Sequence, residues 1–307
     1  MVAAAPTPLQ ATKPPLQGTK RRRAASSDSV VTIGRSRTGT FLANGFGLLF
    51  SLVMIFPVYW VIITAFKPSS EILQSTPTFI PEHPTLDNFI SAIKAPHFLQ
   101  GLTNGLIISV ASVLGALVVG FLAALAIARF KFYGRRALIL VILAVQLVPL
   151  VALIIPLFRM LQGWDLTNTL TGVSLVYLVL LLPYTVWTLR GFISGIPREL
   201  DEAALIDGCS RFQTFWRIIL PLTGPGLVAT SVYGFIQAWN EYIIINTLNL
   251  VDKQNTMAWL AQFQTTHGTA WGPLMAGATI SSIPVVIFFL VIQRNIATGL
   301  TAGAVKG

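Results

Sequence analysis

Six long apolar stretches constrain the fold of this chain more than any other feature of its sequence. Each is long enough to cross about 30 Å of hydrocarbon, which takes about 20 helical residues. A membrane β-barrel would consist of short segments of alternating hydrophobicity instead. We therefore predict an all-α integral membrane protein with six transmembrane helices. The stretches lie near Leu42–Phe66, Asn104–Ala128, Ala137–Phe158, Gly172–Leu189, Gly224–Leu248 and Leu274–Ile292.

The composition excludes a soluble protein. Of the 307 residues, 54% are hydrophobic and only 10% are charged, whereas about 25% of a typical soluble domain is charged. Prolines inside the apolar stretches would break soluble helices, but membrane helices tolerate them because neighbouring elements satisfy the freed carbonyls. We therefore expect helices to continue through Pro57, Pro149, Pro156, Pro183 and Pro284.

The first 40 residues differ from the rest of the chain. They contain prolines, small polar residues and the basic run Lys20–Arg23, and nothing in them could form a core. We predict a disordered basic tail over residues 1–40. A secretory signal is not expected, because the apolar stretch that follows is too long and has no clear cleavage site behind it.

The distribution of positive charge predicts the orientation in the membrane. The formal net charge is +10, and lysine and arginine collect on the cytoplasmic segments of membrane proteins. All but four of the 21 lysines and arginines lie in the tail, in 129–136, in 190–222 or in 293–307. These segments share one side of a six-helix protein, so both termini are predicted to be cytoplasmic. Topology thus explains the charge, and we expect no nucleic-acid partner.

The loop 196–221 carries the sequence signals of two short cytoplasmic helices. Pro197 suits the first position of a helix, and Gly208 suits the left-handed position just past its end. The segment Ser210–Gln213 forms a capping box that starts a second helix. Pro221 then marks the entry to the next membrane helix.

The first of these short helices carries small and apolar side chains at helical spacing. They are Leu200, Ala203, Ala204 and Leu205. Two interpretations remain open for this face. It packs on its own transmembrane bundle, or it projects into a groove on a separate cytosolic protein, which the alanines would allow to approach closely.

The same loop resembles a known family. Its spacing is similar to that of the EAA loop of ABC-importer permeases, in which Glu-Ala-Ala is followed after three residues by Gly, after nine more by Ile and after one more by Leu-Pro. The end of the chain, Gly299–Gly307, and Asn240 resemble the smaller permease subunit of the maltose-type carbohydrate importers. The residues that match the loop pattern are Glu202, Ala203, Ala204, Gly208, Ile218, Leu220 and Pro221.

The resemblance implies a type I ABC-importer permease fold, with a six-helix permease domain over residues 41–297 and a cytoplasmic tail over 298–307. The loop would dock on an ATPase subunit and transmit its ATP-driven closure to the membrane helices. The residues implied in this coupling are Glu202, Ala203, Ala204, Leu205, Asp207, Gly208, Ile218, Leu220 and Pro221. The tail implies further contacts with the ATPase, from Gly299, Leu300, Thr301 and Lys306.

The resemblance also implies partners. They are a second homologous permease that completes a heterodimer, two ATPase subunits, and an extracytoplasmic solute-binding protein. This last protein would contact the outer loops 67–103 and 249–273. The implied solute is a sugar or oligosaccharide, and the implied location is the plasma membrane of a bacterium or archaeon.

The sequence lacks motifs for nucleotide binding, for nucleophilic catalysis and for metal binding. No lysine stands between a glycine and a serine or threonine, so the Gly-Lys-Ser/Thr core of the P-loop is absent. ATP and Mg²⁺ would therefore bind to the partner ATPases, and we expect no cofactor on this chain. Nucleophile and metal motifs are also missing, so we predict no catalytic residues and no metal site.

Few ionisable residues enter the predicted spans, and Glu241 is the clearest. Burying a charge at a helix centre costs on the order of 2.5–3.5 kcal/mol, so such a residue usually faces a cavity or a partner. One interpretation places Trp239, Asn240 and Glu241 along a solute path, with the tryptophan against a sugar ring. The other places Glu241 near the headgroups or against the partner permease.

Two other functions remain as hypotheses. A self-contained secondary transporter or channel would need ionisable groups inside the membrane, for which Glu241 alone is thin support. An intramembrane enzyme would need a nucleophile paired with a base, or a set of metal ligands, and the sequence offers neither.

Overall fold

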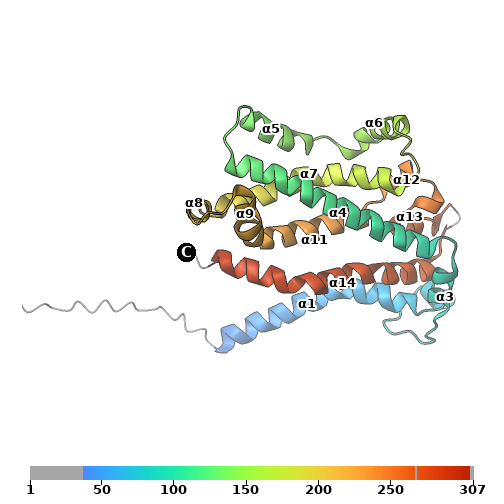
Figure 1. Ribbon diagram of the computed structural model, residues 1–307. Coiled ribbons are helices and arrows are strands. Elements are labelled where there is room, and N and C mark those ends of the chain that lie inside the picture. Colours follow the sequence, from blue (N-terminus) through green and yellow to red (C-terminus); the bar gives the residue numbers. More distant parts are fainter. Residues whose placement is uncertain (1–36, 267, 305–307) are drawn as a thin grey trace, which may run out of the picture. The chain divides into compact units, whose positions relative to one another are not determined.

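The computed structural model describes residues 37–266 and 268–304, most of them in helices (Figure 1). The predicted tail, residues 1–40, lies outside this range except for residues 37–40, which begin the first helix. The helices up to the loop are α1 (Arg37–Ala65), α2 (Ser69–Ile72), α3 (Asp87–Lys94), α4 (Phe98–Arg129), α5 (Arg135–Val145), α6 (Leu150–Gly163) and α7 (Leu170–Gly195). Those from the loop onward are α8 (Glu199–Ile206), α9 (Arg211–Thr214), the π-helix η1 (Phe215–Ile219), α10 (Leu220–Leu222), α11 (Gly224–Asn240), α12 (Ile243–Leu248), the 3₁₀-helix η2 (Val251–Lys253), α13 (Thr256–Ala261) and α14 (Trp271–Ala304).

The chain divides after Leu52 into two units. The described part of the first unit is the beginning of α1, whose apolar side chains are exposed. The second unit, residues 53–307, contains every feature discussed below. It also contains a short antiparallel pair of strands, β1 (Gln264–Thr265) and β2 (Gly268–Thr269).

Helices α4 and α7 form the centre of the second unit, and α11 packs against both of them and against α14. Small residues allow α4 and α7 to approach closely: a Cβ added to Gly120 would lie 2.5 Å from Cγ2 of Thr185. Ser112 joins the same two helices, because its hydroxyl donates to the Ser174 carbonyl at 3.0 Å. Close approach of this kind is typical of membrane helices, where packing and not the hydrophobic effect holds neighbours together.

Among the described residues, four helices are long and apolar enough to span a membrane, and two bent pairs raise the number to six if each pair is one span. Three of these helices contain a proline, as predicted, at Pro57, Pro183 and Pro284, and Pro156 lies inside α6.

The prediction of one continuous helix over 137–158 was wrong. Helices α5 and α6 meet at an angle of 103° across residues 146–149. Pro149 is extended, with φ −60° and ψ 127°. Proline also disfavours the helical conformation in the residue before it, so the chain leaves α5 before it enters α6.

The predicted helix over 224–248 is also interrupted. Helix α11 ends at Asn240, Glu241 is extended with ψ 129°, and α12 starts at Ile243. The Glu241 carboxylate accepts from the Ile244 amide at 3.0 Å and from the Ile245 amide at 3.4 Å. A carboxylate that accepts from the first free amides of a helix stabilises the start of that helix, which explains why α12 begins anew after α11.

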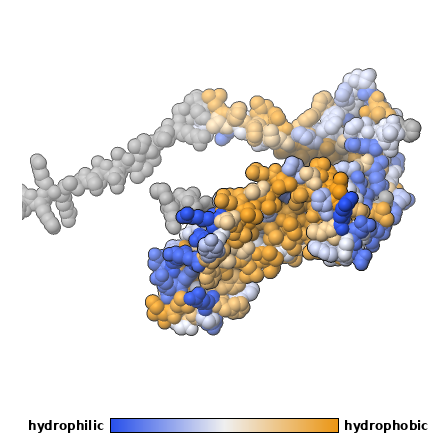
Figure 2. Space-filling model, turned by 90° about the horizontal axis from the view of Figure 1, so that it is seen from above, coloured by the Kyte–Doolittle hydropathy of each residue, from blue (hydrophilic) through white to orange (hydrophobic). Residues whose placement is uncertain are grey.

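Figure 2 shows hydrophobic residues over the middle of the second unit and hydrophilic residues gathered at its ends. Exposed apolar side chains run along α4, α7 and α14. This distribution is typical of a protein whose surface faces lipid or another membrane subunit.

Candidate functional site

The loop after α7 folds into a helical hairpin, as predicted. Helix α8 ends before Gly208, whose φ of 84° lies in the left-handed region that favours glycine. Ser210 and Gln213 form both hydrogen bonds of the capping box, at 2.7 and 3.2 Å. Helix α8 begins at Glu199, two residues after Pro197, so the proline precedes the first turn and does not occupy its first position.

Replacing Gly208 with alanine is expected to loosen the hairpin. A non-glycine residue in the left-handed region costs about 1–2 kcal/mol, and nothing else crowds this position. If 1 kcal/mol of local stability is lost, amide exchange in α8 and α9 becomes about fivefold faster by hydrogen–deuterium exchange. Gly195→Ala is the control, because Gly195 lies in α7 with equally open surroundings and no positive φ. Equal exchange in both variants would contradict the prediction.

Each of the two interpretations of α8 holds for a different part of its surface. Ala204 is buried and packs on the chain itself. Ala203 is exposed, and so are the larger Leu200, Leu205 and Ile206, with Ile206 85% exposed. An isoleucine this exposed gains nothing from burial within the chain, so this end of α8 is a free apolar surface.

Aromatic residues fix the second helix of the hairpin to the bundle. The Phe215 ring packs edge-on against Phe121 of α4, with ring centroids 5.5 Å apart. Phe212 and Trp216 pack on Phe215 but remain 69% and 52% exposed. The hairpin therefore has one side anchored on α4 and one side open.

The end of the loop pattern shapes the entry into α11. Pro221 has no N–H to donate to the carbonyl four residues earlier, which disfavours a regular α-helix at this point. The preceding residues, Phe215–Ile219, form a π-helix, and the axis bends by 66° before α11. Ile218 and Leu220 are half-buried here. The Ile and Leu-Pro positions of the pattern therefore lie at the joint between the hairpin and the membrane helix.

An ion pair ties α8 to the end of α4. Arg129 Nε lies 3.0 Å from Asp201 Oδ2, and the two side chains are 8% and 20% exposed. The same guanidinium donates to the Ile196 carbonyl at 3.1 Å, and Arg198 donates to the Ala128 carbonyl at 3.3 Å. The hairpin is therefore fastened to α4 on both sides of its first turn.

The C-terminal end of α14 lies at the same end of the second unit as α8 and α9 (Figure 1). The backbone of Gly299, Leu300 and Thr301 is helical, since α14 continues to Ala304. Lys306 lies outside the described residues. Contacts of this segment with an ATPase stay a prediction.

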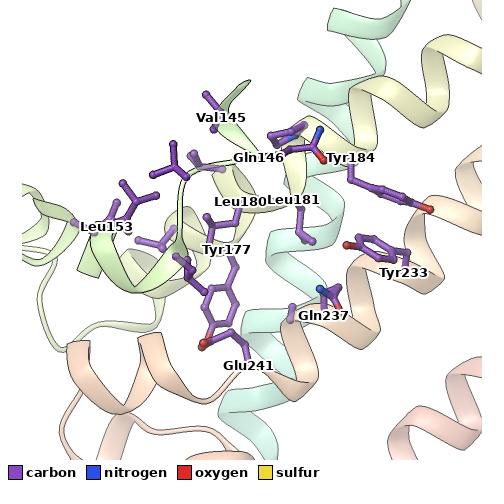
Figure 3. A pocket seen from close by; sticks show the side chains of 17 residues that line it. Val145, Gln146, Leu153, Tyr177, Leu180, Leu181, Tyr184, Tyr233, Gln237 and Glu241 are labelled. Atoms are coloured by element: carbon purple, nitrogen blue, oxygen red, sulfur yellow. The ribbon is translucent and has the colours of Figure 1, made fainter. Parts of the chain in front are cut away.

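A cavity of about 410 Å³ opens beside the α5–α6 break, between α7 and α11 (Figure 3). Tyr184 and Tyr233 stack on its wall with ring centroids 3.7 Å apart. Gln146 and Gln237 add amide groups to a lining that is otherwise mostly apolar. An apolar pocket with a few polar groups and aromatic faces is suited to a small polar solute.

The side chains of the three predicted path residues do not share this cavity. Glu241 borders the cavity and accepts a hydrogen bond from the Tyr177 hydroxyl. Trp239 is only 2% exposed and stacks on Phe235 in the core, so the structure does not place its ring against a solute. Asn240 is exposed, and its side chain donates to its own helix at the Ile236 carbonyl. Only Glu241 of the three lines this cavity.

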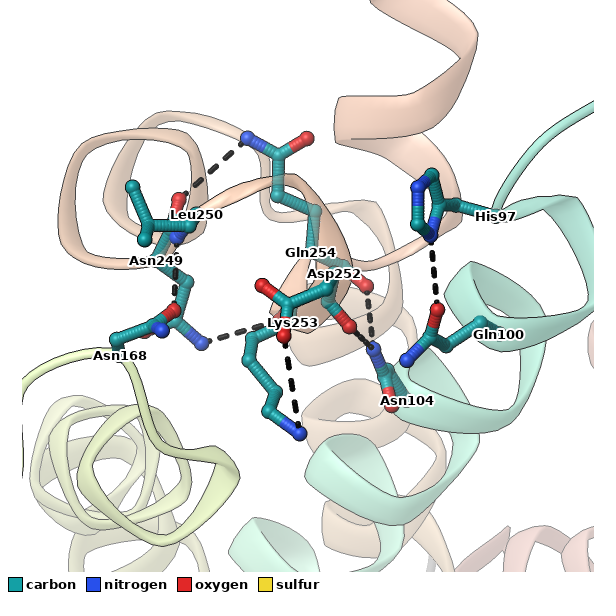
Figure 4. A network of polar contacts seen from close by, with 9 residues as sticks. All are labelled: His97, Gln100, Asn104, Asn168, Asn249, Leu250, Asp252, Lys253 and Gln254. Carbon is teal, nitrogen blue, oxygen red and sulfur yellow. Dashed lines mark hydrogen bonds and ion pairs between the residues drawn. The ribbon is translucent and has the colours of Figure 1, made fainter.

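Amide side chains hold the loops around α12 (Figure 4), at the opposite end of the second unit from α8 (Figure 1). Asn104 of α4 donates to the carbonyls of Asp252 and Gln254, at 3.2 and 2.9 Å. Asn168 accepts from the Leu250 amide at 2.9 Å. These bonds join segments more than 80 residues apart, and they give the loop after α12 a fixed shape.

Two features of the hairpin and the cavity were not predicted from the sequence. The partners in the Arg129–Asp201 pair are 72 residues apart, and the basic loop that contains Arg129 signalled only orientation. The stacked tyrosines, Tyr184 and Tyr233, lie on different helices, and nothing in the spacing of either helix indicates that they meet.

Comparison with known proteins agrees with this arrangement. A family described as binding-protein-dependent transport system inner membrane component matches residues 116–301. The diacetylchitobiose uptake system permease protein DasC of Streptomyces coelicolor is 39% identical over 274 residues, covering 89% of this chain and 99% of DasC. The trehalose/maltose transport system permease protein MalG of Thermococcus litoralis is 35% identical over 264 residues, covering 85% of this chain and 94% of MalG.

Solved structures share the fold. A chain of a bacterial ABC transporter involved in the import of the acidic polysaccharide alginate superposes with a TM-score of 0.72 at 19% identity, covering 84% of this chain and 98% of that one. The family match and the two relatives confirm the resemblance to ABC-importer permeases. This chain belongs to the family of binding-protein-dependent transport system inner membrane components.

Proposed function

We propose that this chain is one of two permease subunits of an ABC importer that carries a sugar or short oligosaccharide into the cell. The observation that carries the proposal is the free apolar end of α8, where Leu205 is 46% and Ile206 85% exposed. Family membership supports the importer. The names of the relatives, which refer to diacetylchitobiose, trehalose and maltose, support the sugar.

The coupling site is the α8–α9 hairpin. Ala203, Leu205 and Ile206 enter an apolar cleft on an ATPase subunit that binds ATP and Mg²⁺. The acidic residues beside them, Glu202 and Asp207, are exposed and meet polar groups at the rim of that cleft. The end of α14 adds contacts to the same ATPase, because it reaches the same end of the unit.

Each bent pair acts as one pass, which gives six passes and puts both termini on the same side of the membrane. The end that holds α8 also holds Arg129, Arg135, Arg198 and their basic neighbours, which favours a cytoplasmic position for it. The outer loops 67–103 and 249–273 then face the solute-binding protein. The location is the plasma membrane of a bacterium or archaeon.

The solute passes the cavity beside the α5–α6 break, between this subunit and a homologous partner. The stacked tyrosines supply flat apolar faces for a sugar ring, and the glutamine amides supply hydrogen bonds for its hydroxyls. The alternative function, a secondary transporter, has weak support. The Glu241 carboxylate is already engaged by the Tyr177 hydroxyl and by two amides of α12.

The test is reconstitution. We expect the chain to co-purify with an ATPase and a second permease, and the complex in liposomes to import a labelled disaccharide only with ATP and the solute-binding protein. The chain without the ATPase should import nothing. Uptake by the chain alone, driven by an ion gradient, would instead support the secondary transporter.

Replacing Tyr184 with alanine tests the position of the path. An aromatic contact is worth about 1 kcal/mol, so the transport rate at saturating binding protein should fall about fivefold. Affinity of the solute-binding protein for the sugar should stay unchanged. Trp187→Ala is the control, because Trp187 lies on the same helix, is 45% exposed and does not line the cavity. Equal transport by both variants would place the path elsewhere.

A further inference from the structure

A second cavity, of about 400 Å³, lies at the end of the unit opposite α8. Its walls come from the end of α1, from α2 with the loop that follows it, and from the start of α14. It shares no lining residue with the cavity beside α7. Its volume is within the range of about 300–1,000 Å³ that is typical of small-molecule sites.

A buried ammonium borders this second cavity. Lys67 is only 3% exposed, and its Nζ lies 4.8 Å from the centroid of the Trp60 ring. Nζ also donates to the Thr78 carbonyl. A lysine ammonium has three N–H donors, so further donors are available to a ligand that accepts hydrogen bonds.

A buried carboxylate balances this charge. Glu71 is 5% exposed and accepts from the Thr78 hydroxyl at 2.6 Å and from the Glu82 amide at 3.2 Å. The Thr78 hydroxyl is the main cause that lowers the pKa of Glu71 below its ordinary value. The carboxylate is therefore ionised at neutral pH, and the site carries no net charge.

One polar atom at the cavity lacks a partner. The Thr64 side chain lines the cavity and is 7% exposed, and its Oγ1 has no hydrogen bond within the described residues. A buried hydroxyl without a partner is destabilising, because it has lost its hydrogen bonds to water. A hydroxyl group of a ligand would remove that cost.

The remaining walls suit a sugar ring. Trp60 is held by Phe56 and Phe79, with ring centroids 5.8 Å away in each case. Trp271, which is 41% exposed, adds a second indole from α14. Indole faces bind the C–H faces of a sugar, while the ammonium and the Thr64 hydroxyl bind its hydroxyls.

We propose that this second cavity binds one ring of a neutral saccharide and receives the solute at the outer end of the importer. The proposal rests on the proposed function. The absence of net charge selects against anionic sugars, because a carboxylate would meet Glu71 as well as Lys67.

Protection of an introduced cysteine from maleimide labelling tests the proposal. The variant Gln74→Cys places a thiol on the cavity wall, in a Cys209→Ser background that removes the chain's own cysteine. Maleimide labelling of the assembled importer is then measured with maltose or N,N′-diacetylchitobiose as probes. At a probe concentration of about ten times Kd the site is about 90% occupied, so labelling should slow about tenfold.

Controls assign the protection to this cavity. Thr64→Val removes one hydrogen bond and should weaken binding about fivefold, so protection should fall from about tenfold to about threefold. Thr103→Val should leave it near tenfold, since Thr103 bonds only to its own helix and lies outside the cavity. Methyl α-D-glucuronide, whose ring carries a carboxylate, should not protect at a concentration at which neutral methyl α-D-glucoside does. Undiminished, about tenfold protection in Thr64→Val would overturn the proposal.

Three further outcomes separate the possible failures. Protection by the sugar-free solute-binding protein, with none by either saccharide, would make the cavity a protein-docking pocket and overturn the saccharide site. Importer with Gln74→Cys that still takes up sugar but shows no protection by either saccharide would overturn the subsite alone. Absence of ATP-dependent uptake of any sugar would overturn the proposed function, and the subsite with it.

Discussion

Importers that carry Ile206→Asp in this chain are expected to lose ATP-dependent uptake while the chain still folds. The Ile206 side chain is 85% exposed at the end of α8, so aspartate there costs the isolated chain almost nothing. In the complex, the carboxylate would enter an apolar cleft without a partner. Central interface residues contribute about 2 kcal/mol or more, which corresponds to at least about thirtyfold weaker ATPase binding.

The measurement is co-purification of the ATPase together with uptake into liposomes. Ile206→Leu is the matched control, because it keeps an apolar side chain of the same size and should retain both activities. Circular dichroism and elution volume should match the wild type for both variants. Wild-type uptake by Ile206→Asp would rule out α8 as the docking element.

The hairpin could be predicted from the sequence because its signals are local. Gly208 requires no distant partner to take a left-handed conformation, and the capping box of Ser210 and Gln213 spans one turn. The same holds for the spans, whose length and hydrophobicity are properties of continuous segments. What the sequence left open was which side of α8 is free, since Ala204 is buried and Ala203 is exposed only in the folded chain.

The breaks in the third and fifth stretches were harder to predict. Of the five prolines expected inside helices, four lie there and Pro149 does not, so the residue type alone does not decide the outcome. From the sequence, Glu241 was considered as a charged residue along the solute path, but its carboxylate also stabilises the first turn of α12. Local sequence could not separate these roles, because they depend on where Tyr177 lies.

Contacts between helices account for the remaining differences. Trp239 was expected along the path, yet it stacks on Phe235 in the core. The cavity itself needs the bend between α5 and α6, which brings Gln146 toward Tyr184 on the next membrane helix. Such contacts follow from the packing of helices against one another, and a single sequence contains no local signal for them.

Replacing Asp201 with asparagine is expected to uncouple ATP hydrolysis from uptake without releasing the ATPase. Asp201 and Arg129 join α8 to the end of α4 at 3.0 Å, and both side chains are largely covered. A motion imposed on α8 therefore reaches α4 through this pair. Without the negative charge, a coupling energy of about 1 kcal/mol is lost, and the sugar imported per ATP falls about fivefold.

The control and the rescue isolate this role. Glu199→Gln removes a charge from the same turn of α8, but Glu199 is exposed, so uptake per ATP should stay near the wild type. The exchanged pair, Arg129→Asp with Asp201→Arg, should restore part of the coupling, because it recreates the ion pair in reverse. A structural role alone would lower assembly and hydrolysis together. Since α4 packs along α7 and α11, both of which line the solute cavity, a tether at Asp201 gives the ATPase a mechanical route to the path.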